Sequence, residues 1–253
     1  MPVRALTRFL FLTAVLVLAA AIAVVAVFPE ADLVVARWFW TPADAFWLSG
    51  HGWAALLRRV SMWPTIGLGI AALVSVLQHI LAPSSRQFMT ARAAVFLFLT
   101  VVAAPVVLVN GVLKEHWDRA RPVHVTELGG PWRFTPWWRP GDGTECRTNC
   151  SFISGESSGA AWLVAPALLA PPAVRPAALA AVAAYTVLIS ALRMGFGGHF
   201  LSDTLIATLL TLLIVALGYH WLYRRPSAPG EDALAARLAR LGAPVRRLFG
   251  RAA

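Results

Sequence analysis

The sequence predicts an all-α membrane protein with six transmembrane helices, and three observations support this fold class. First, 58% of the 253 residues are hydrophobic, only 13% are charged, and the mean hydropathy is +0.68, which is far too apolar for an ordinary soluble domain. Second, the longest apolar runs approach the ~20 residues that cross a ~30 Å hydrocarbon core. Third, segments rich in arginine, proline or aromatic residues separate the runs. We expect six of these runs to be membrane spans.

The first apolar run covers residues 8–28 and is expected to be the first span. A cleaved signal peptide is the alternative, but the run exceeds the ~7–15 apolar residues of a signal core, and no clear small-x-small site closes it. Residues 29–63 contain prolines and several tryptophans, the composition of a segment that lies along one membrane face. Within this segment, Arg58 and Arg59 are expected to face lipid headgroups and to have no catalytic role.

The remaining runs complete a membrane domain that covers residues 1–223. Its predicted core is residues 93–223, which contain the last four spans and a long polar loop at residues 114–156. In the tail, residues 224–253, leucines recur at helical spacing among arginines, which predicts an amphipathic helix on the membrane surface. Spans two to six are predicted at residues 64–81, 93–113, 157–170, 177–192 and 200–223.

The distribution of arginine predicts the orientation of the bundle. Six spans put both chain ends, the loop with Arg86 and Arg92 and the turn with Arg175 on one side, which the positive-inside rule makes cytoplasmic. The loop at 114–156 and the turn at 193–199 then share the outer side. The formal charge of +10 is spread between apolar runs and does not form one basic domain, so nucleic acid is not expected as a partner.

The two cysteines of the chain, Cys146 and Cys150, lie in the long outer loop. On an oxidising side of a membrane, a close pair favours a small disulfide. A zinc site would need further cysteine or histidine ligands at suitable spacing, and none stand near. We therefore expect a disulfide at this position and no bound metal.

The first polar cluster ends the third predicted span. Lys114 and Arg121 are seven residues apart, so both lie on one face if the helix continues for two turns. Pro122 then discourages further helix. Two cations on one face suit a phosphate, whereas the alternative is that these charges only mark the end of a span.

A second cluster opens the fourth predicted span. Ser154 and Gly155 precede a helix, where a hydroxyl and backbone N–H groups can bind an anion. Glu156 follows them. Taken alone, Ser154 could simply cap the helix.

The third cluster lies between the fifth and sixth predicted spans. His199 and Asp203 are four residues apart, so the carboxylate is expected to hold the imidazole in one tautomer. Glycines 195, 197 and 198 allow a sharp turn that returns Arg193 toward His199. Ionisable groups at a membrane boundary indicate function when partners exist, and the two other clusters are predicted on the same side.

Together, the motifs Lys-x6-Arg-Pro, Ser-Gly-x and Arg-x5-His-x3-Asp resemble those of the type 2 phosphatidic acid phosphatase superfamily, over residues 105–220. The resemblance implies a six-helix phosphatase with an outward-facing site, in which His199 attacks phosphorus to form a phosphohistidine and Asp203 orients the ring. Water then releases inorganic phosphate, and no cofactor is needed. It also implies that the phosphate is bound by Lys114, Arg121, Ser154, Gly155 and Arg193.

Two residues depart from the family pattern. Glu156 stands where the family has the histidine that protonates the leaving oxygen. A carboxylic acid can take that role if a poorly solvated site raises its pKa, and the alternative is a leaving group good enough to need little help. Leu192 stands where a serine is frequent. The Ser-Gly-Glu variant is similar to that of bacterial lipid A phosphatases, which implies the bacterial inner membrane with a periplasmic site.

The substrate and the assembly cannot be read from the motifs, because the phosphate site recognises only the phosphate. A lipid A or phospholipid substrate is expected, and phosphatidylglycerophosphate and undecaprenyl diphosphate are alternatives. A transporter is disfavoured, because it would need charges in the middle of its spans. A lipid-binding protein that has lost catalysis is suggested by Glu156 alone. The sequence does not give the oligomeric state.

Overall fold

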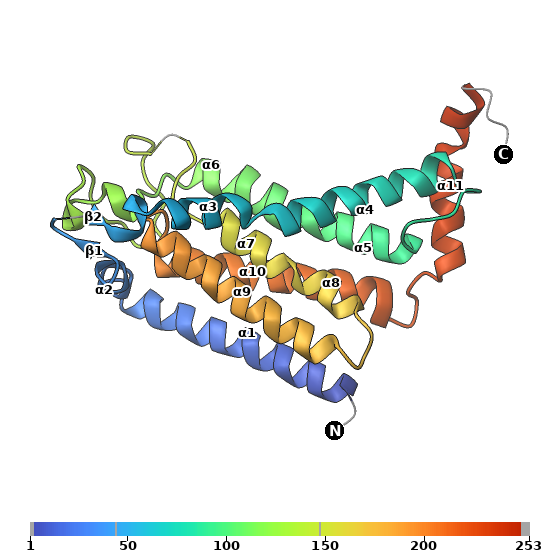
Figure 1. Ribbon diagram of the computed structural model, residues 1–253, viewed down its shortest axis with the longest axis horizontal. Helices are drawn as coiled ribbons and strands as arrows, with labels where there is room; N and C mark the ends of the chain where they lie inside the picture. Colours follow the sequence, from blue (N-terminus) through green and yellow to red (C-terminus); the bar gives the residue numbers. More distant parts are fainter. Residues whose placement is uncertain (1–2, 44, 147, 249–253) are drawn as a thin grey trace.

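The protein is an elongated bundle of helices, seen in a computed structural model that describes residues 3–43, 45–146 and 148–248 (Figure 1). The long helices run along the length of the molecule, and most of the short elements gather with the long loops at one end. The long helices are α1 (Val3–Val27), α4 (Trp63–Leu81), α5 (Ala91–Val101), α9 (Arg175–Gly195) and α10 (Leu201–Tyr219).

Four stretches of continuous helix are long and apolar enough to cross a membrane in the described part of the chain. A fifth is added if Phe11–Val27 and Glu30–Arg37, which are bent by 104° relative to each other, count as one span. The six predicted spans are therefore not confirmed. The four stretches are Gly52–Leu81, Ala91–His116, Arg175–Gly195 and Leu201–Arg224.

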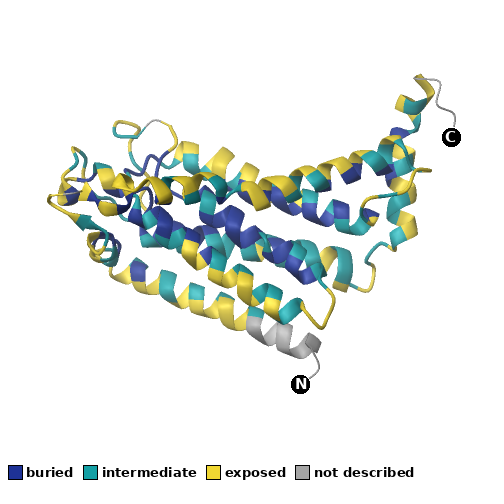
Figure 2. Ribbon diagram, viewed as in Figure 1, coloured by how far each residue is buried: buried dark blue, intermediate teal, exposed yellow. Residues whose placement is uncertain are grey.

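The predicted fourth span is replaced by two short helices, α7 (Gly155–Trp162) and α8 (Val164–Leu169). The helix breaks at Leu163, because Pro166 has no N–H to donate to the carbonyl of Trp162. These helices lie in the centre of the bundle, where nearly all their residues are buried (Figure 2). The Trp162 indole is fully buried and donates to the Thr100 hydroxyl at 3.0 Å. The first of them, α7, starts directly after the long polar loop and is enclosed by the long helices.

The sequence predicted that residues 29–63 form one segment along a membrane face. The structure instead divides them into two parts. Their last part, α3 (Gly52–Val60), lies in line with α4 and lengthens the second span (Figure 1). The earlier part folds over the end of the bundle. It contains α2 (Ala31–Arg37), a hairpin of β1 (Trp40–Thr41) and β2 (Ala45–Phe46), and the 3₁₀ turn η1 (Trp47–Gly50).

The helix of the third span ends earlier than the motif spacing predicted. α5 continues as the π-helix η2 (Val102–Leu113) and the short α6 (Lys114–His116). Asp118 then has a φ of 50°, which a continuing helix cannot accommodate. Lys114 and Arg121 therefore do not share a helix face, and a loop brings Arg121 to the site. Two short 3₁₀ turns follow, η3 (Pro122–His124) and η4 (Thr126–Leu128).

The basic tail forms the helix α11 (Glu231–Leu248) at the end of the molecule opposite the hairpin (Figure 1). The chain reaches it through the π-helical turn η5 (His220–Arg224). The Glu231 carboxylate accepts the N–H groups of Ala91 and Arg92, at 2.5 and 3.2 Å, and so caps the start of α5. The predicted tail helix thus packs against the bundle, far from the polar clusters.

Candidate active site

His199 lies in the tight turn between α9 and α10, and its side chain is only 1% exposed. Gly197 has a φ of 64°, a conformation that glycine adopts without steric cost. A Cβ at Gly198 would lie 2.5 Å from the Arg193 guanidinium. The glycines of this turn therefore let Arg193 fold back beside the histidine, as the sequence predicted.

A backbone carbonyl orients the His199 ring, not the carboxylate that the sequence predicted. His199 Nδ1 is 2.7 Å from the carbonyl oxygen of Ser151 and 3.9 Å from Asp203 Oδ2. A carbonyl oxygen can only accept, so the contact with Ser151 assigns the ring proton to Nδ1. Nε2 is then left with a free lone pair, as a nucleophile needs.

Asp203 supports the loop that orients the histidine. It lies in the first turn of α10, where its Oδ2 accepts the Phe200 N–H at 2.8 Å and the Ser151 hydroxyl at 2.6 Å. Its Oδ1 accepts from Arg119 Nη1 at 2.6 Å. Asp203 therefore acts on His199 through Ser151, whose side chain it binds and whose carbonyl holds the ring.

A second carboxylate, from α2, completes this buried arrangement. Asp32 Oδ2 accepts from Arg119 Nη2 at 2.8 Å and from the Ser202 hydroxyl at 2.6 Å, and its Oδ1 accepts the Ser202 N–H at 2.8 Å. Arg119 also donates from Nη1 to the Ser202 hydroxyl at 2.8 Å. All these side chains are at most 1% exposed. We call Asp32, Arg119, Ser202 and Asp203 the inner network.

The ion pairs of the inner network keep Arg119 charged although it has no contact with water. Burial opposes the charge, but Asp203 and Asp32 outweigh it and raise the pKa of Arg119 above its usual value. Two features of the sequence point to this network. Asp32 is an acid in an apolar, aromatic segment, and Arg119 lies two residues before a motif arginine. Neither feature predicts a role by itself, because the pairing of Asp32 with Arg119 depends on how α2 folds over the end of the bundle.

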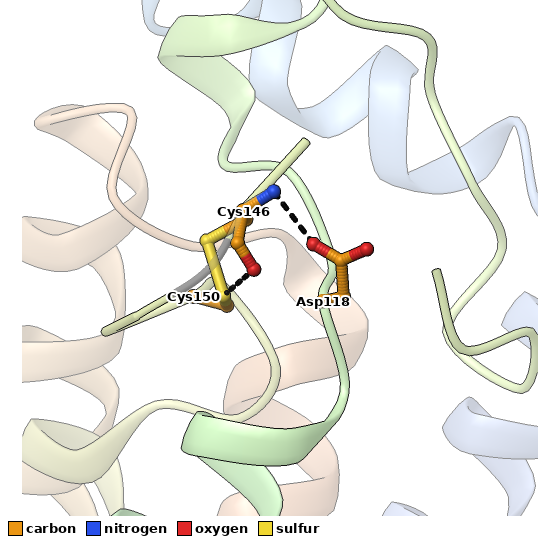
Figure 3. Close-up of side chains that lie close together, drawn as sticks. All are labelled: Asp118, Cys146 and Cys150. Atoms are coloured by element: carbon orange, nitrogen blue, oxygen red, sulfur yellow. Dashed lines mark hydrogen bonds between the residues drawn. A yellow bond between two sulfur atoms is a disulfide. The ribbon is translucent and has the colours of Figure 1, made fainter. Parts of the chain in front are cut away.

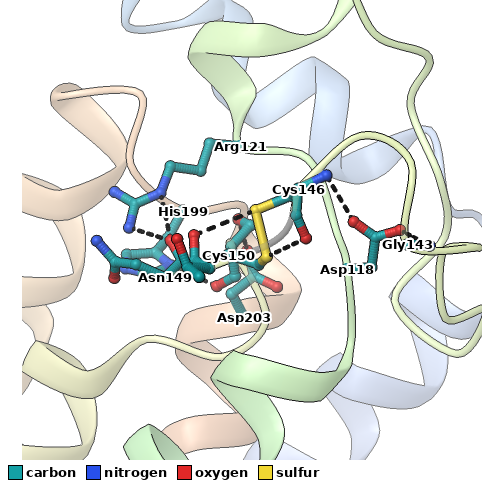
Figure 4. The surroundings of a disulfide bond; sticks show 10 residues. Asp118, Arg121, Gly143, Cys146, Asn149, Cys150, His199 and Asp203 are labelled. Atoms are coloured by element: carbon teal, nitrogen blue, oxygen red, sulfur yellow. Dashed lines mark hydrogen bonds and ion pairs between the residues drawn. A yellow bond between two sulfur atoms is a disulfide. The ribbon is translucent and has the colours of Figure 1, made fainter.

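The three cations predicted to bind phosphate lie around His199. Burial and the charges of Arg193, Lys114 and Arg121 lower the pKa of the histidine well below its ordinary value. Arg193 is itself only 2% exposed. Arg121 donates from Nε and Nη2 to the carbonyl oxygen of Asn149, at 3.2 and 2.7 Å (Figure 4). The ring is thus held neutral in a positively charged environment.

The second motif lies at the start of α7. Ser154 Oγ accepts the Ser157 N–H at 3.2 Å and the Ser157 hydroxyl at 2.9 Å, so this serine caps the helix. Its own N–H donates to the carbonyl oxygen of Asp203 at 3.3 Å, which ties the second motif to the third. A Cβ at Gly155 would overlap the side chain of Asn110. Ser154 thus contacts the third motif through its backbone, its hydroxyl has a structural role, and Gly155 packs against Asn110.

Glu156 pairs with two arginines at the outer edge of the site. Its Oε2 lies 2.6 Å from Arg193 Nε, and its Oε1 lies 3.6 Å from Arg58 Nε. The side chains of Glu156 and Arg58 are 23% and 44% exposed. We call these three residues the outer cluster. Arg58 was expected to face lipid headgroups, and α3 instead directs it toward the site.

A disulfide joins Cys146 and Cys150, whose Cα atoms are 5.7 Å apart. Asp118 accepts the Cys146 N–H at 2.6 Å (Figure 3) and also accepts the Gly143 N–H. Asp118 and the two cysteines lie close enough to suggest a metal site, but sulfurs bonded to each other cannot bind a metal as thiolates. The disulfide loop leads directly to the carbonyls of Asn149 and Ser151, which hold Arg121 and His199.

Comparisons with known proteins agree with the motif resemblance. The family profile described as PAP2 superfamily matches residues 93–227. A lipid A 4'-phosphatase of Rhizobium leguminosarum is 42% identical over 118 residues, which are 46% of this chain and 49% of that protein. Its counterpart in Rhizobium etli is 41% identical over 117 residues, 46% of this chain and 44% of that protein. A lipid A 4'-phosphatase of Francisella tularensis subsp. novicida is 28% identical over 202 residues, 79% of this chain and 89% of that protein.

The family profile covers the predicted core of the chain, residues 93–223. The family profile includes all the motif residues, from Lys114 to Asp203. The chain spans about half the length of the two Rhizobium relatives that it matches. No solved structure matches the chain.

Proposed function

Because the chain belongs to the PAP2 superfamily, we propose that it is a membrane phosphatase that removes a phosphate from a lipid through a phosphohistidine at His199. One observation carries this proposal. A buried histidine, with its Nδ1 proton fixed by a carbonyl, is surrounded by the three motif cations Lys114, Arg121 and Arg193. That arrangement provides a neutral nucleophile and positive charge for an incoming phosphate.

In the proposed reaction, His199 Nε2 attacks phosphorus while the bond from phosphorus to the lipid oxygen breaks. The leaving oxygen takes a proton from water at the exposed edge of the site, and the hydroxide that remains takes up the proton released when water attacks in the second step. The ring keeps its Nδ1 proton, donated to the Ser151 carbonyl, and carries a positive charge as phosphohistidine. Water then attacks phosphorus, the bond from phosphorus to Nε2 breaks, and inorganic phosphate leaves with the neutral histidine restored.

The inner network supports the charged intermediate. It contains two carboxylates and one guanidinium, so it has a net negative charge behind the ring. This charge favours the cationic phosphohistidine over a neutral ring. Lys114, Arg121 and Arg193 stabilise the charge on the phosphate oxygens, and the N–H of Gly155 at the start of α7 adds a backbone donor.

Glu156 fits a charge partner better than the proton donor that its motif position implies. Two arginines lie beside its carboxylate, one at each oxygen, which is the arrangement of a carboxylate that positions guanidinium groups. We therefore assign Glu156 the role of orienting Arg193 and Arg58. Its replacement by glutamine, considered in the Discussion, separates the two roles.

Lipid A is the proposed substrate, because the matched relatives are named lipid A 4'-phosphatases. The distribution of arginines supports a bacterial inner membrane protein with cytoplasmic ends and a periplasmic site. The test is a panel of lipid A, phosphatidylglycerophosphate and undecaprenyl diphosphate, with purified protein in detergent and a chelator present. We expect phosphate release, fastest from lipid A. No release from any lipid, or a strict requirement for a divalent metal, contradicts the proposal.

A further inference from the structure

Arg58 is a cation that the proposed phosphate site does not use. In the described part of the chain, the cations that act on the His199 ring are Arg193, Lys114 and Arg121. Arg58 interacts electrostatically with Arg121 and Arg193. Arg58 therefore lies beside the cations that surround His199 and not beside the His199 ring itself.

The fold holds Arg58 in this place. Ala54 of α3 is fully buried in a cluster with Ile189 and Leu192 of α9, so α3 is packed against the helix that carries Arg193. The Arg58 guanidinium lies 5.6 Å from the centroid of the Phe196 ring, in the turn that leads to His199. Its side chain is nevertheless 44% exposed, so it can meet a substrate that enters from outside.

The Glu156 carboxylate lies between Arg58 and Arg193. Its two oxygens face the two guanidinium groups, at 3.6 and 2.6 Å from their Nε atoms. Carboxylates and phosphates are the groups that arginine binds through two oxygens. The position between the two arginines is therefore built for an anion, and in this structure a side chain of the protein occupies it.

We propose that Arg58 binds a second anionic group of the substrate, a phosphate or carboxylate adjacent to the phosphate that is removed, and that this group displaces the Glu156 carboxylate. The preferred substrates would then be lipids whose headgroup carries two neighbouring acidic groups. The inference rests on the proposed phosphatase function for the inner phosphate, but it concerns a binding property that can be measured without turnover.

The experiment compares two non-hydrolysable probes that differ by one anionic group, methylphosphonate and methylenediphosphonate. Calorimetry on the full chain in detergent gives their dissociation constants. We expect the diphosphonate to bind the unmodified protein about tenfold more tightly, or better, since hydrogen bonds between charged groups are among the strong ones. Arg58→Gln should remove most of this preference. Arg59→Gln, an exposed neighbour on the same helix, should retain it.

A second variant tests the displaced carboxylate. Glu156→Gln should tighten diphosphonate binding several-fold, because no carboxylate then competes for Arg58. Three results would overturn the proposal: no preference for the diphosphonate, an equal loss of both probes in Arg58→Gln, or weaker diphosphonate binding in Glu156→Gln. Failure of the phosphatase function is a separate result, in which the probes bind as expected but no lipid phosphate is hydrolysed.

Discussion

The two groups of charges beside His199 differ in how firmly they are held. Every side chain of the inner network is at most 1% exposed and has several hydrogen-bond partners, whereas Glu156 and Arg58 of the outer cluster are 23% and 44% exposed. Removing one member of a buried ion pair strands a charge, but a half-exposed pair can exchange its partner for water or substrate. We infer that the inner network positions the nucleophile and that the outer cluster recognises the anionic groups of the substrate.

The largest effect is expected at the residue that separates the two groups. His199→Gln removes the nucleophile while keeping a side-chain donor near the Ser151 carbonyl. Turnover should fall about 10⁴-fold or more, measured as phosphate release in detergent. The thermal midpoint of the variant serves as the control for folding. Substantial activity in a folded variant would contradict the phosphohistidine mechanism.

Within the inner network, Arg119 should be the most sensitive position. Arg119→Gln leaves Asp32 and Asp203 buried without their shared cation, and breaking a buried ion pair costs about 3–5 kcal/mol. We expect a large drop in the thermal midpoint and poor recovery of folded protein. Arg133→Gln, at an arginine of the same outer loop, is the matched control. A variant of Arg119 as stable as this control would show that the network does not support the fold.

Asp32→Asn tests whether the inner network also positions the nucleophile. The amide oxygen can still accept the Ser202 N–H, but one charge-assisted contact with Arg119 is lost, at a cost of about 1.5–3 kcal/mol. We expect kcat to fall about tenfold or more with little change in KM, because the substrate does not contact this residue. A rise in KM alone, or an effect confined to the thermal midpoint, would argue against positioning.

These inner contacts also show what the sequence could and could not predict. Spacing and the family resemblance predict the motif residues, and the turn at Gly197 brings Arg193 to His199 as expected. The roles of Asp32, Ser151 and Arg119 depend on contacts between segments that are 48 to 170 residues apart. No local pattern encodes such contacts.

The differences between the predicted spans and the observed helices have identifiable physical causes. An apolar run of residues 157–170 looks like a span, but Pro166 breaks it into two short central helices. The tryptophans of residues 29–63 indicated a membrane interface, yet α3 continues the line of α4 and directs Arg58 to the site. Composition thus predicts an all-α membrane protein, whereas proline and helix packing determine where the long apolar helices begin and end.

The electrostatics of His199 predict how stability and activity depend on pH. Burial and the charges of Arg193, Lys114 and Arg121 lower the pKa of this histidine, with Asp203 on α10 as the nearby anion. Below the unfolded pKa of about 6.5, the unfolded chain binds a proton that the folded protein does not. The free energy of unfolding should therefore fall by about 1.4 kcal/mol per pH unit until the folded pKa is reached.

The measurement is chemical denaturation in detergent at a series of pH values below 6.5. His199→Gln should lack this contribution, so its stability should fall less steeply with pH than that of the unmodified protein. Because the folded histidine stays neutral, the acidic limb of kcat/KM should also lie below about pH 6.5. An acidic limb at or above pH 6.5 would show that the ring is not held neutral by its surroundings.

The smallest effect is expected in the outer cluster, where Glu156→Gln removes a charge that water can partly replace. If the carboxylate orients Arg193 and Arg58, hydrolysis of the lipid phosphate and of p-nitrophenyl phosphate should change by the same few-fold factor. If it is the general acid, the lipid reaction should slow far more, because p-nitrophenolate leaves readily without a proton. Equal changes in the two hydrolysis rates would show that Glu156 acts with the groups that bind the substrate. A selective loss of lipid hydrolysis would show that it donates the proton in the chemical step.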